Sequence, residues 1–490
     1  AENDCDENIF TDSHDNQADC TNDSELNNDV GTLDQENSVD AFDNSISDQD
    51  NNVAISQELL ADNDCNGTGG NLAICFNDGD LDFNSVDFIE QSNGADLFGD
   101  VSSAQINDIA VGQSGALVNT CDETGGGVNQ AECRNDEIRS LVGLISQFNG
   151  LTAPNSDTAT QSSGVQITQN LETVNDCDEE GTGFNFAGCE NIAHNFIDTV
   201  DQINDASASD DLVQSNFVGI TQDLQTENIC DETGLGDNNA ICGNVAENFI
   251  GSVGQINDAD GSGDADFTQN NNIPTINQVL LAENDCDQLD EQSAEGDNSA
   301  ICDNDDVANQ LGSITQENSA VGTHVDDIFQ DNTGSFSQVM TLNNGCDATT
   351  FTDDGDNVAL CSNFLNLNLI GAVEQVNEAV GLDDVLIDQD NTVSVSQDLT
   401  ANNDCDSTAS NFAECRPFAN NRADSTIQQT NDATGDGFAQ ISQGNDAVID
   451  QDIDLLNSCD ESGAGVNLAE CDYVAFNIIG PVSQGNEVSS

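Results

Sequence analysis

The 490-residue chain contains no lysine, no tryptophan, one methionine and one tyrosine, and its strongly basic side chains are four arginines. Against these stand 94 aspartates and glutamates, which give a formal net charge of −90. Without a basic patch the chain cannot neutralise phosphate groups, so nucleic-acid binding is excluded as a function. The same charge argues against docking on anionic lipid.

The chain also lacks any apolar run of about 18 residues, so we expect no membrane insertion. It starts at Ala1 rather than at a methionine, and no signal peptide is recognisable. We interpret it as a mature, exported product whose signal peptide has already been removed.

Motifs of catalysis are missing as well. The sequence has no G-x-S-x-G, no P-loop and no H-E-x-x-H, and aspartate pairs are too frequent to mark a site. The three histidines (His14, His194 and His324) fall at different phases of the repeat described below. We therefore expect no enzyme, no catalytic residue and no cofactor.

What the chain does have is 18 cysteines in nine pairs, with partners 10 to 16 residues apart and successive pairs starting 53 to 60 residues apart. Zinc sites favour shorter spacings with several ligands, so we expect no metal site here. Regular pairs in an exported protein predict disulfides, but the spacing leaves open whether partners join within a loop, between neighbouring loops or between molecules. The candidates are Cys5/Cys20, Cys65/Cys75, Cys121/Cys133, Cys177/Cys189, Cys230/Cys242, Cys286/Cys302, Cys346/Cys361, Cys405/Cys415 and Cys459/Cys471.

This rhythm predicts one repeat array over residues 1–490, with nine cysteine loops and about eight full repeats. The expected units are approximately 5–64, 65–120, 121–176, 177–229, 230–285, 286–345, 346–404, 405–458 and a partial 459–490.

Each unit carries a motif h-x-Q-x-N-x-h, in which h is an aliphatic residue or alanine, as in "VEQVNEA" at 373–379. Its glutamines are Gln35, Gln91, Gln147, Gln202, Gln255, Gln316, Gln375, Gln429 and Gln484. Its asparagines are Asn37, Asn93, Asn149, Asn204, Asn257, Asn318, Asn377, Asn431 and Asn486.

Two further glutamine motifs follow in each full unit. The second glutamine usually lies 14 residues after the first, and the third usually lies eight residues after the second. The next cysteine always lies eight residues after the third glutamine. Drifting low-complexity sequence would not keep such distances, so intrinsic disorder is rejected.

The period of two within the motifs predicts strands with one face inward and an outer face of Asp, Glu, Ser and Thr. Stacked identical units place each inward residue on its own copy, so carboxylates would repel one another. An amide instead donates to one neighbour and accepts from the other, which forms a continuous ladder. The predicted fold is therefore all-β: a repeat β-solenoid of stacked β-arches (a β-arcade) that forms a polymeric cross-β sheet.

These residues resemble known families. The Q-x-N motifs are similar to the curlin repeats of bacterial functional amyloid. With the acidic units and one cysteine pair per repeat, the chain from Cys5 to Asn486 resembles more closely the amyloid-like major sheath protein of filamentous methanogenic archaea. That resemblance implies β-arch stacks that close into hoops or tubes, cross-linked by disulfides and resistant to denaturants and proteases. A unit of about 56 residues is longer than a curlin repeat, so whether it forms one layer or two stays open.

The expected function is that of a structural protein that assembles with copies of itself into an extracellular sheath, hoop or filament at the cell surface. The alternative is a calcium-dependent acidic adhesin or matrix protein, because stretches such as "DADGSGDAD" at 258–266 are rich in oxygen ligands. Neither an EF-hand spacing nor a calcium-binding nonapeptide recurs, so we expect diffuse cations such as Ca²⁺ rather than defined sites.

Overall fold

The computed structural model describes residues 2–4, 7–8, 16–23, 28–42, 46–68, 71–78, 82–98, 101–153, 156–208, 211–289, 297–349, 356–382, 385–408, 410–423, 425–436, 439–462 and 468–489. The predicted all-β solenoid is confirmed: these residues form strands of one parallel sheet system and no helix. In this part of the chain no helix is long and apolar enough to cross a membrane.

The strands vary in length because the chain bends without a break in some coils and with a break in others. The first twelve are β1 (Glu2–Asp4), β2 (Glu7–Asn8), β3 (Asn16–Asp23), β4 (Asn28–Phe42), β5 (Ile46–Thr68), β6 (Asn71–Asp78), β7 (Asp82–Phe98), β8 (Val101–Ala153), β9 (Ser156–Ala208), β10 (Asp211–Ile229), β11 (Glu232–Leu235) and β12 (Asn238–Leu289). The others are β13 (Asn298–Asp305), β14 (Ala308–Thr349), β15 (Asp356–Ile370), β16 (Val373–Leu382), β17 (Leu386–Thr408), β18 (Ser410–Ala423), β19 (Ile427–Gly435), β20 (Gln440–Ser462), β21 (Leu468–Cys471), β22 (Val474–Ile479) and β23 (Val482–Ser489).

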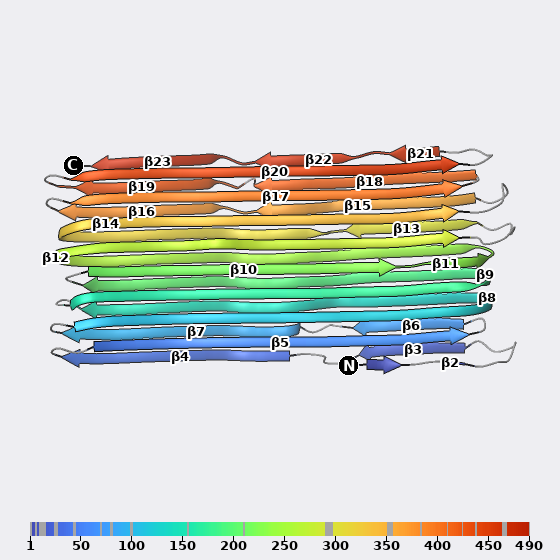
Figure 1. Cartoon of the computed structure of the whole chain (residues 1–490), viewed down its shortest axis with the longest axis horizontal. Helices are drawn as coiled ribbons and strands as arrows, with labels where there is room; N and C mark the ends of the chain where they lie inside the picture. Colours follow the sequence, from blue (N-terminus) through green and yellow to red (C-terminus); the bar gives the residue numbers. More distant parts are fainter. Residues whose placement is uncertain are drawn as a thin grey trace.

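Each repeat forms one coil with two long legs that run in opposite directions (Figure 1). We call A-leg the leg that starts a few residues before the second cysteine of a loop and runs through the Q-x-N motif, for example 185–208. The B-leg returns through the second and third glutamines to the next cysteine, for example 211–232. Strands of A-legs, such as β7, β16 and β19, point the opposite way from β5, β10 and β17 of B-legs (Figure 1).

Successive coils stack in parallel register, A-leg on A-leg and B-leg on B-leg. Gln202 lies between Gln147 and Gln255, and Gln214 lies between Gln161 and Gln269. One repeat therefore adds one layer to each of the two stacked faces. The three glutamine motifs do not form three separate strands, because the second and third share one uninterrupted B-leg.

Apolar and amide rows alternate along the space between the legs. Buried and outward residues alternate along β10 because successive strand residues point to opposite faces. From the turn inward, its buried side chains are Leu212, Gln214, Asn216, Val218, Ile220, Gln222, Leu224, Thr226 and Asn228, followed by Cys230. Stacked coils turn the apolar members into four continuous clusters of Ala/Leu, Val/Ile, Leu/Ala and Cys/Ala side chains.

The outer face of the A-legs differs from the expected purely polar surface. Large apolar side chains are exposed there, and all four arginines lie in A-legs of β8 and β18. The expectation was wrong because outward positions inside and after the Q-x-N motif, such as Phe148 and Leu382, are also apolar. Exposed members include Phe98, Phe148, Ile241, Phe364 and Leu382.

A glycine column marks the middle of several A-legs, where the alternation shifts by one residue. A Cβ at Gly312 would collide with the carbonyl oxygen of Gly251, and one at Gly251 with that of Asp198. At Gly251 and Gly312 the backbone of the preceding coil therefore approaches too closely for a side chain, whereas the same position of an earlier coil holds Asp198.

Candidate functional site: amide ladders and cysteine row

The predicted Q-x-N residues form two hydrogen-bonded ladders along the stack. Each Gln Nε2 donates to the Oε1 of the glutamine one coil earlier, from Gln91 to Gln35 through Gln484 to Gln429, at 2.7–2.9 Å. Each Asn Nδ2 donates to the Oδ1 one coil later, from Asn37 to Asn93 through Asn431 to Asn486, at 2.8–3.2 Å. Each buried amide therefore donates a hydrogen bond to the coil on one side and accepts one from the coil on the other.

The second and third glutamines form ladders of the same kind on the B-legs. Their donor–acceptor distances are 2.7–2.9 Å in the second row and 2.6–2.9 Å in the third. Many of these amides also tie the two legs together. Gln222, for example, donates to Gln169 Oε1 at 2.8 Å, to the carbonyl of Asn195 at 3.2 Å and to that of Phe249 at 3.1 Å.

Further asparagine ladders, which were not predicted from the sequence, lie beside the cysteines. Asn63, Asn119, Asn175, Asn228, Asn284, Asn344 and Asn403 bond in succession at 2.9–3.1 Å. A partner row two residues after the second cysteine zigzags between them, as Asn191 does by donating to Asn228 at 2.8 Å and to Asn244 at 3.2 Å. The signal was present, because every first cysteine is preceded two residues earlier by asparagine.

The described cysteines form one row of sulfur atoms between the legs. Each first cysteine lies on a B-leg between second cysteines of two A-legs, and sulfurs gather in groups within 4.8 Å, such as Cys230, Cys242 and Cys286. The predicted Cys5 lies outside the described residues; Cys20 lies in β3 in register with Cys75, and its side chain is not among those described.

Most bonds in the row join the second cysteine of one loop to the first cysteine of the next loop, rather than the two partners within a loop. The disulfides between successive loops are Cys189–Cys230, Cys242–Cys286, Cys302–Cys346, Cys361–Cys405 and Cys415–Cys459. Cys121–Cys133 and Cys459–Cys471 join within a loop. Because a sulfur forms one disulfide, the two bonds of Cys459 are alternatives.

Cys65, Cys75 and Cys177 are unbonded and buried thiols. Burial raises the pKa of the Cys177 thiol, and nearby aspartates add to it. Cys177 nevertheless lies 2.7 Å from the sulfur of Cys189, whose disulfide is to Cys230. A cysteine in the row such as Cys189 therefore has two neighbouring sulfurs, one in its own loop and one in an adjacent loop.

One position contradicts the expectation that carboxylates stay outside. Glu123, Glu179 and Glu232, each two residues after a first cysteine, are at most 1% exposed and stack in register. Burial and the neighbouring carboxylates raise the pKa of Glu179 to about 10, and burial raises that of Glu232 to about 8.

Aspartates form a second acidic row on the outside, directly after the first cysteines. Asp178, Asp287 and Asp347 have pKa values raised to about 6, about 7 and about 6, first by partial burial and then by neighbouring aspartates. In-register stacking thus puts like charges on adjacent coils all along this surface.

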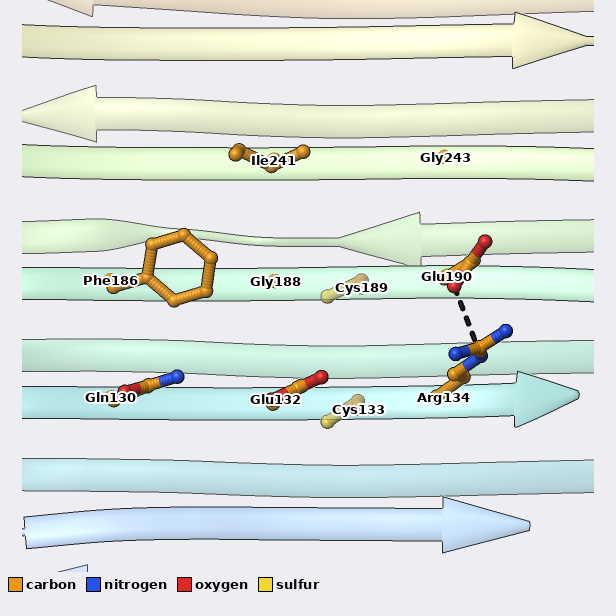
Figure 2. Close-up of a pocket in the computed structure, with 10 residues that line it drawn as sticks. All are labelled: Gln130, Glu132, Cys133, Arg134, Phe186, Gly188, Cys189, Glu190, Ile241 and Gly243. Carbon is orange, nitrogen blue, oxygen red and sulfur yellow. Dashed lines mark ion pairs between the residues drawn. The ribbon is translucent and has the colours of Figure 1, made fainter. Parts of the chain in front are cut away.

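A surface groove of the A-legs is lined by Phe186, Gly188 and Glu190 (Figure 2), and the ring of Phe186 lies so close to Gly188 that a Cβ there would be 2.9 Å from it. Arg134 closes one side, with its Nε 3.0 Å from Glu190 Oε2 and its guanidinium 5.6 Å from the ring centre of Phe76. These charges are paired with each other, and Cys133 and Cys189 beside the groove are in disulfides.

A second groove contains Arg139, His194 and Glu247 in three successive coils. Burial and then Arg139 lower the pKa of His194 to about 4, so its imidazole is neutral at pH 7. His194 Nδ1 lies 3.7 Å from Glu247 Oε2, and the rings of Phe196 and Phe249 stack at 4.7 Å beside it. The groove has no hydroxyl or thiol among its lining residues to act as a nucleophile.

Comparison of the chain with protein-family models, with curated proteins and with solved structures found no match.

Proposed function

We propose that the protein is a structural building block that assembles with copies of itself into an extracellular, amyloid-like and disulfide-stabilised sheath, hoop or filament that protects the cell. In this proposal it is exported, lies in a sheath or surface layer and catalyses no reaction. The kind of protein proposed is the one that the Q-x-N and cysteine rhythm resembles, the sheath protein of filamentous methanogenic archaea.

The in-register amide ladders carry this proposal. They require only that the next coil offers the same residues at the same height, and a coil of another copy offers Gln, Asn and Cys in the same order. Stacked amides and dry apolar rows are the interactions that make cross-β assemblies stable. The row of sulfurs supports a covalently linked polymer, because disulfides such as Cys242–Cys286 already join successive cysteine loops along the row.

The composition fits a protective layer outside the cell. With four arginines and no lysine, trypsin-like proteases find few sites. Disulfides such as those between successive loops form and persist in oxidising surroundings.

Electron microscopy of the purified, oxidised chain tests the proposal. We expect filaments, hoops or sheets whose diffraction has a reflection at about 4.8 Å along the axis and one near 10 Å across it. Incubation with reductant before assembly gives the matched control for the disulfides. A monodisperse monomer at high concentration under oxidising conditions would contradict the proposal.

The second candidate is a calcium-dependent acidic adhesin or matrix protein, and the acidic rows beside the cysteines favour it. It predicts that dispersed protein binds cells or matrix ligands only when Ca²⁺ is present. Calcium-independent filaments without such binding would decide against it.

A further inference from the structure

Three glutamates are buried in line where the B-leg enters the cysteine-loop turn. Glu123 is in register with Glu179, and Glu179 with Glu232, so their side chains stack on three successive coils. Their exposed fractions are 0%, 1% and 0%. The amides used elsewhere in the interior show that the fold normally avoids this arrangement.

The carboxylate of Glu179, the middle one of the three, receives no hydrogen bond. Neither oxygen of Glu179 has a hydrogen-bond partner. Glu232 accepts a hydrogen bond from the Ala187 backbone N–H through Oε1, and its Oε2 has no partner. An ionised carboxylate buried between two others is strongly disfavoured unless a cation or a proton neutralises it.

The row of glutamates is also limited in length. In the next coil Gln288 takes the same position, in register with Glu232, and donates to the carbonyl of Ser299 at 2.6 Å. The chain therefore can fill this position with an amide, as in its other rows, but has three carboxylates in succession. Such a local exception points to a specific ligand rather than to the general acidity of the chain.

We propose that Glu123, Glu179 and Glu232 form an intramolecular calcium site, in which Ca²⁺ lies in the gaps between successive carboxylates and Glu179 is the shared ligand. Neighbouring strands are about 4.7–4.9 Å apart. Twice the Ca–O distance of about 2.3–2.6 Å gives about 4.6–5.2 Å, so one ion reaches a carboxylate on either side.

The spacing between coils also favours Ca²⁺ over Mg²⁺. Twice the Mg–O distance of about 2.0–2.1 Å is about 4.0–4.2 Å, too short to span two coils, and Mg²⁺ gives up its water reluctantly. Calcium also accepts amide and carbonyl oxygens. The Oδ1 of Asn129, six residues after Glu123 in β8, is buried and has no hydrogen-bond partner, so it is a candidate further ligand.

The test compares two single substitutions in the full chain. Glu179→Gln removes the shared carboxylate and introduces the residue that this row already contains at 288, so it is compatible with the fold. Glu172→Gln is the control, because it removes one charge from the exposed face of the same leg. Bound calcium is measured by elemental analysis after dialysis in salt high enough to remove diffuse ions. Calcium affinity is measured by titration with Ca²⁺ alone.

We expect the unmodified chain and Glu172→Gln to retain calcium after dialysis and to gain thermal stability when Ca²⁺ is added. Glu179→Gln should lose the retained calcium, bind Ca²⁺ at least about tenfold more weakly and lose the calcium-dependent shift in melting temperature. Equal calcium retention in all three proteins would overturn the site. So would the absence of retained calcium from the unmodified chain together with a melting temperature that follows pH and not Ca²⁺, because the glutamates would then be protonated.

Discussion

Replacement of one interior glutamine by glutamate should lower the free energy of unfolding far more than the same replacement on the surface of the array. Gln222 is fully buried in the third glutamine row. It donates three hydrogen bonds, to Gln169, Asn195 and Phe249, and accepts one from Gln278 at 2.9 Å. Glutamate has nearly the same shape but no amide donors.

The magnitude follows from the hydrogen bonds that are lost. A protonated glutamate at 222 can donate at most one of the three bonds, so two buried acceptors lose their partner at about 1–3 kcal/mol each. We therefore expect Gln222→Glu to lower the free energy of unfolding by about 2–6 kcal/mol at pH 5. Because burial raises the pKa of a carboxyl group, the loss grows by up to about 1.4 kcal/mol per pH unit above that.

Urea unfolding followed by circular dichroism measures the loss in monomeric protein at pH 5 and pH 8. Gln225→Glu is the matched control, because Gln225 lies three residues further along β10 and points outward. It should change stability by less than about 0.5 kcal/mol. Equal stabilities of the two variants at pH 8 would refute the account of the ladders.

Three more predictions follow from other contacts. Gly312→Ala should destabilise the fold by about 1–3 kcal/mol in the same assay, because its Cβ meets the Gly251 carbonyl, whereas Gly94→Ala, whose nearest atom is at 3.9 Å, should not. Calcium-free protein should be more stable at pH 5 than at pH 8, and Glu179 alone should contribute up to roughly 4 kcal/mol of this difference. The raised pKa of Glu179 keeps its proton in the folded state, whereas the unfolded state loses that proton above about pH 4.3. A thermal scan that shows the reverse order would contradict the burial of this group. Peptide mapping without reductant should recover the disulfides Cys302–Cys346 and Cys361–Cys405, each of which stabilises the fold by about 4 kcal/mol through loop closure. Recovery of within-loop pairs alone would contradict this connectivity.

The repeat and its inward amides were predictable because stacking makes each position meet its own copy. The pattern of a single unit was therefore enough to predict the ladders, including the inward positions of Gln202 and Asn204. The legs were not predictable in full, because strand signals between Cys189 and Val200 lack the glutamine motif and their aliphatic residues point both ways.

The glutamate row shows a different limit. The tripeptide Cys-Asp-Glu at 177–179 has the period-two pattern that places Glu179 inward, but the rule that carboxylates repel one another argued against it. Cysteine pairing was also undecided, because Cys230 lies near two cysteines: it is bonded to Cys189, and the sulfur of Cys242 lies within 4.8 Å. Spacing along the chain does not separate two neighbours that are related by stacking.

Cryo-electron microscopy of the oxidised assembly tests the central claim most directly. The account predicts a map in which strands run across the axis and the amide ladders continue without a change of spacing from the coils of one copy into those of the next. Dispersed monomers, or an assembly in which copies meet only through the outer faces of their legs, would contradict it.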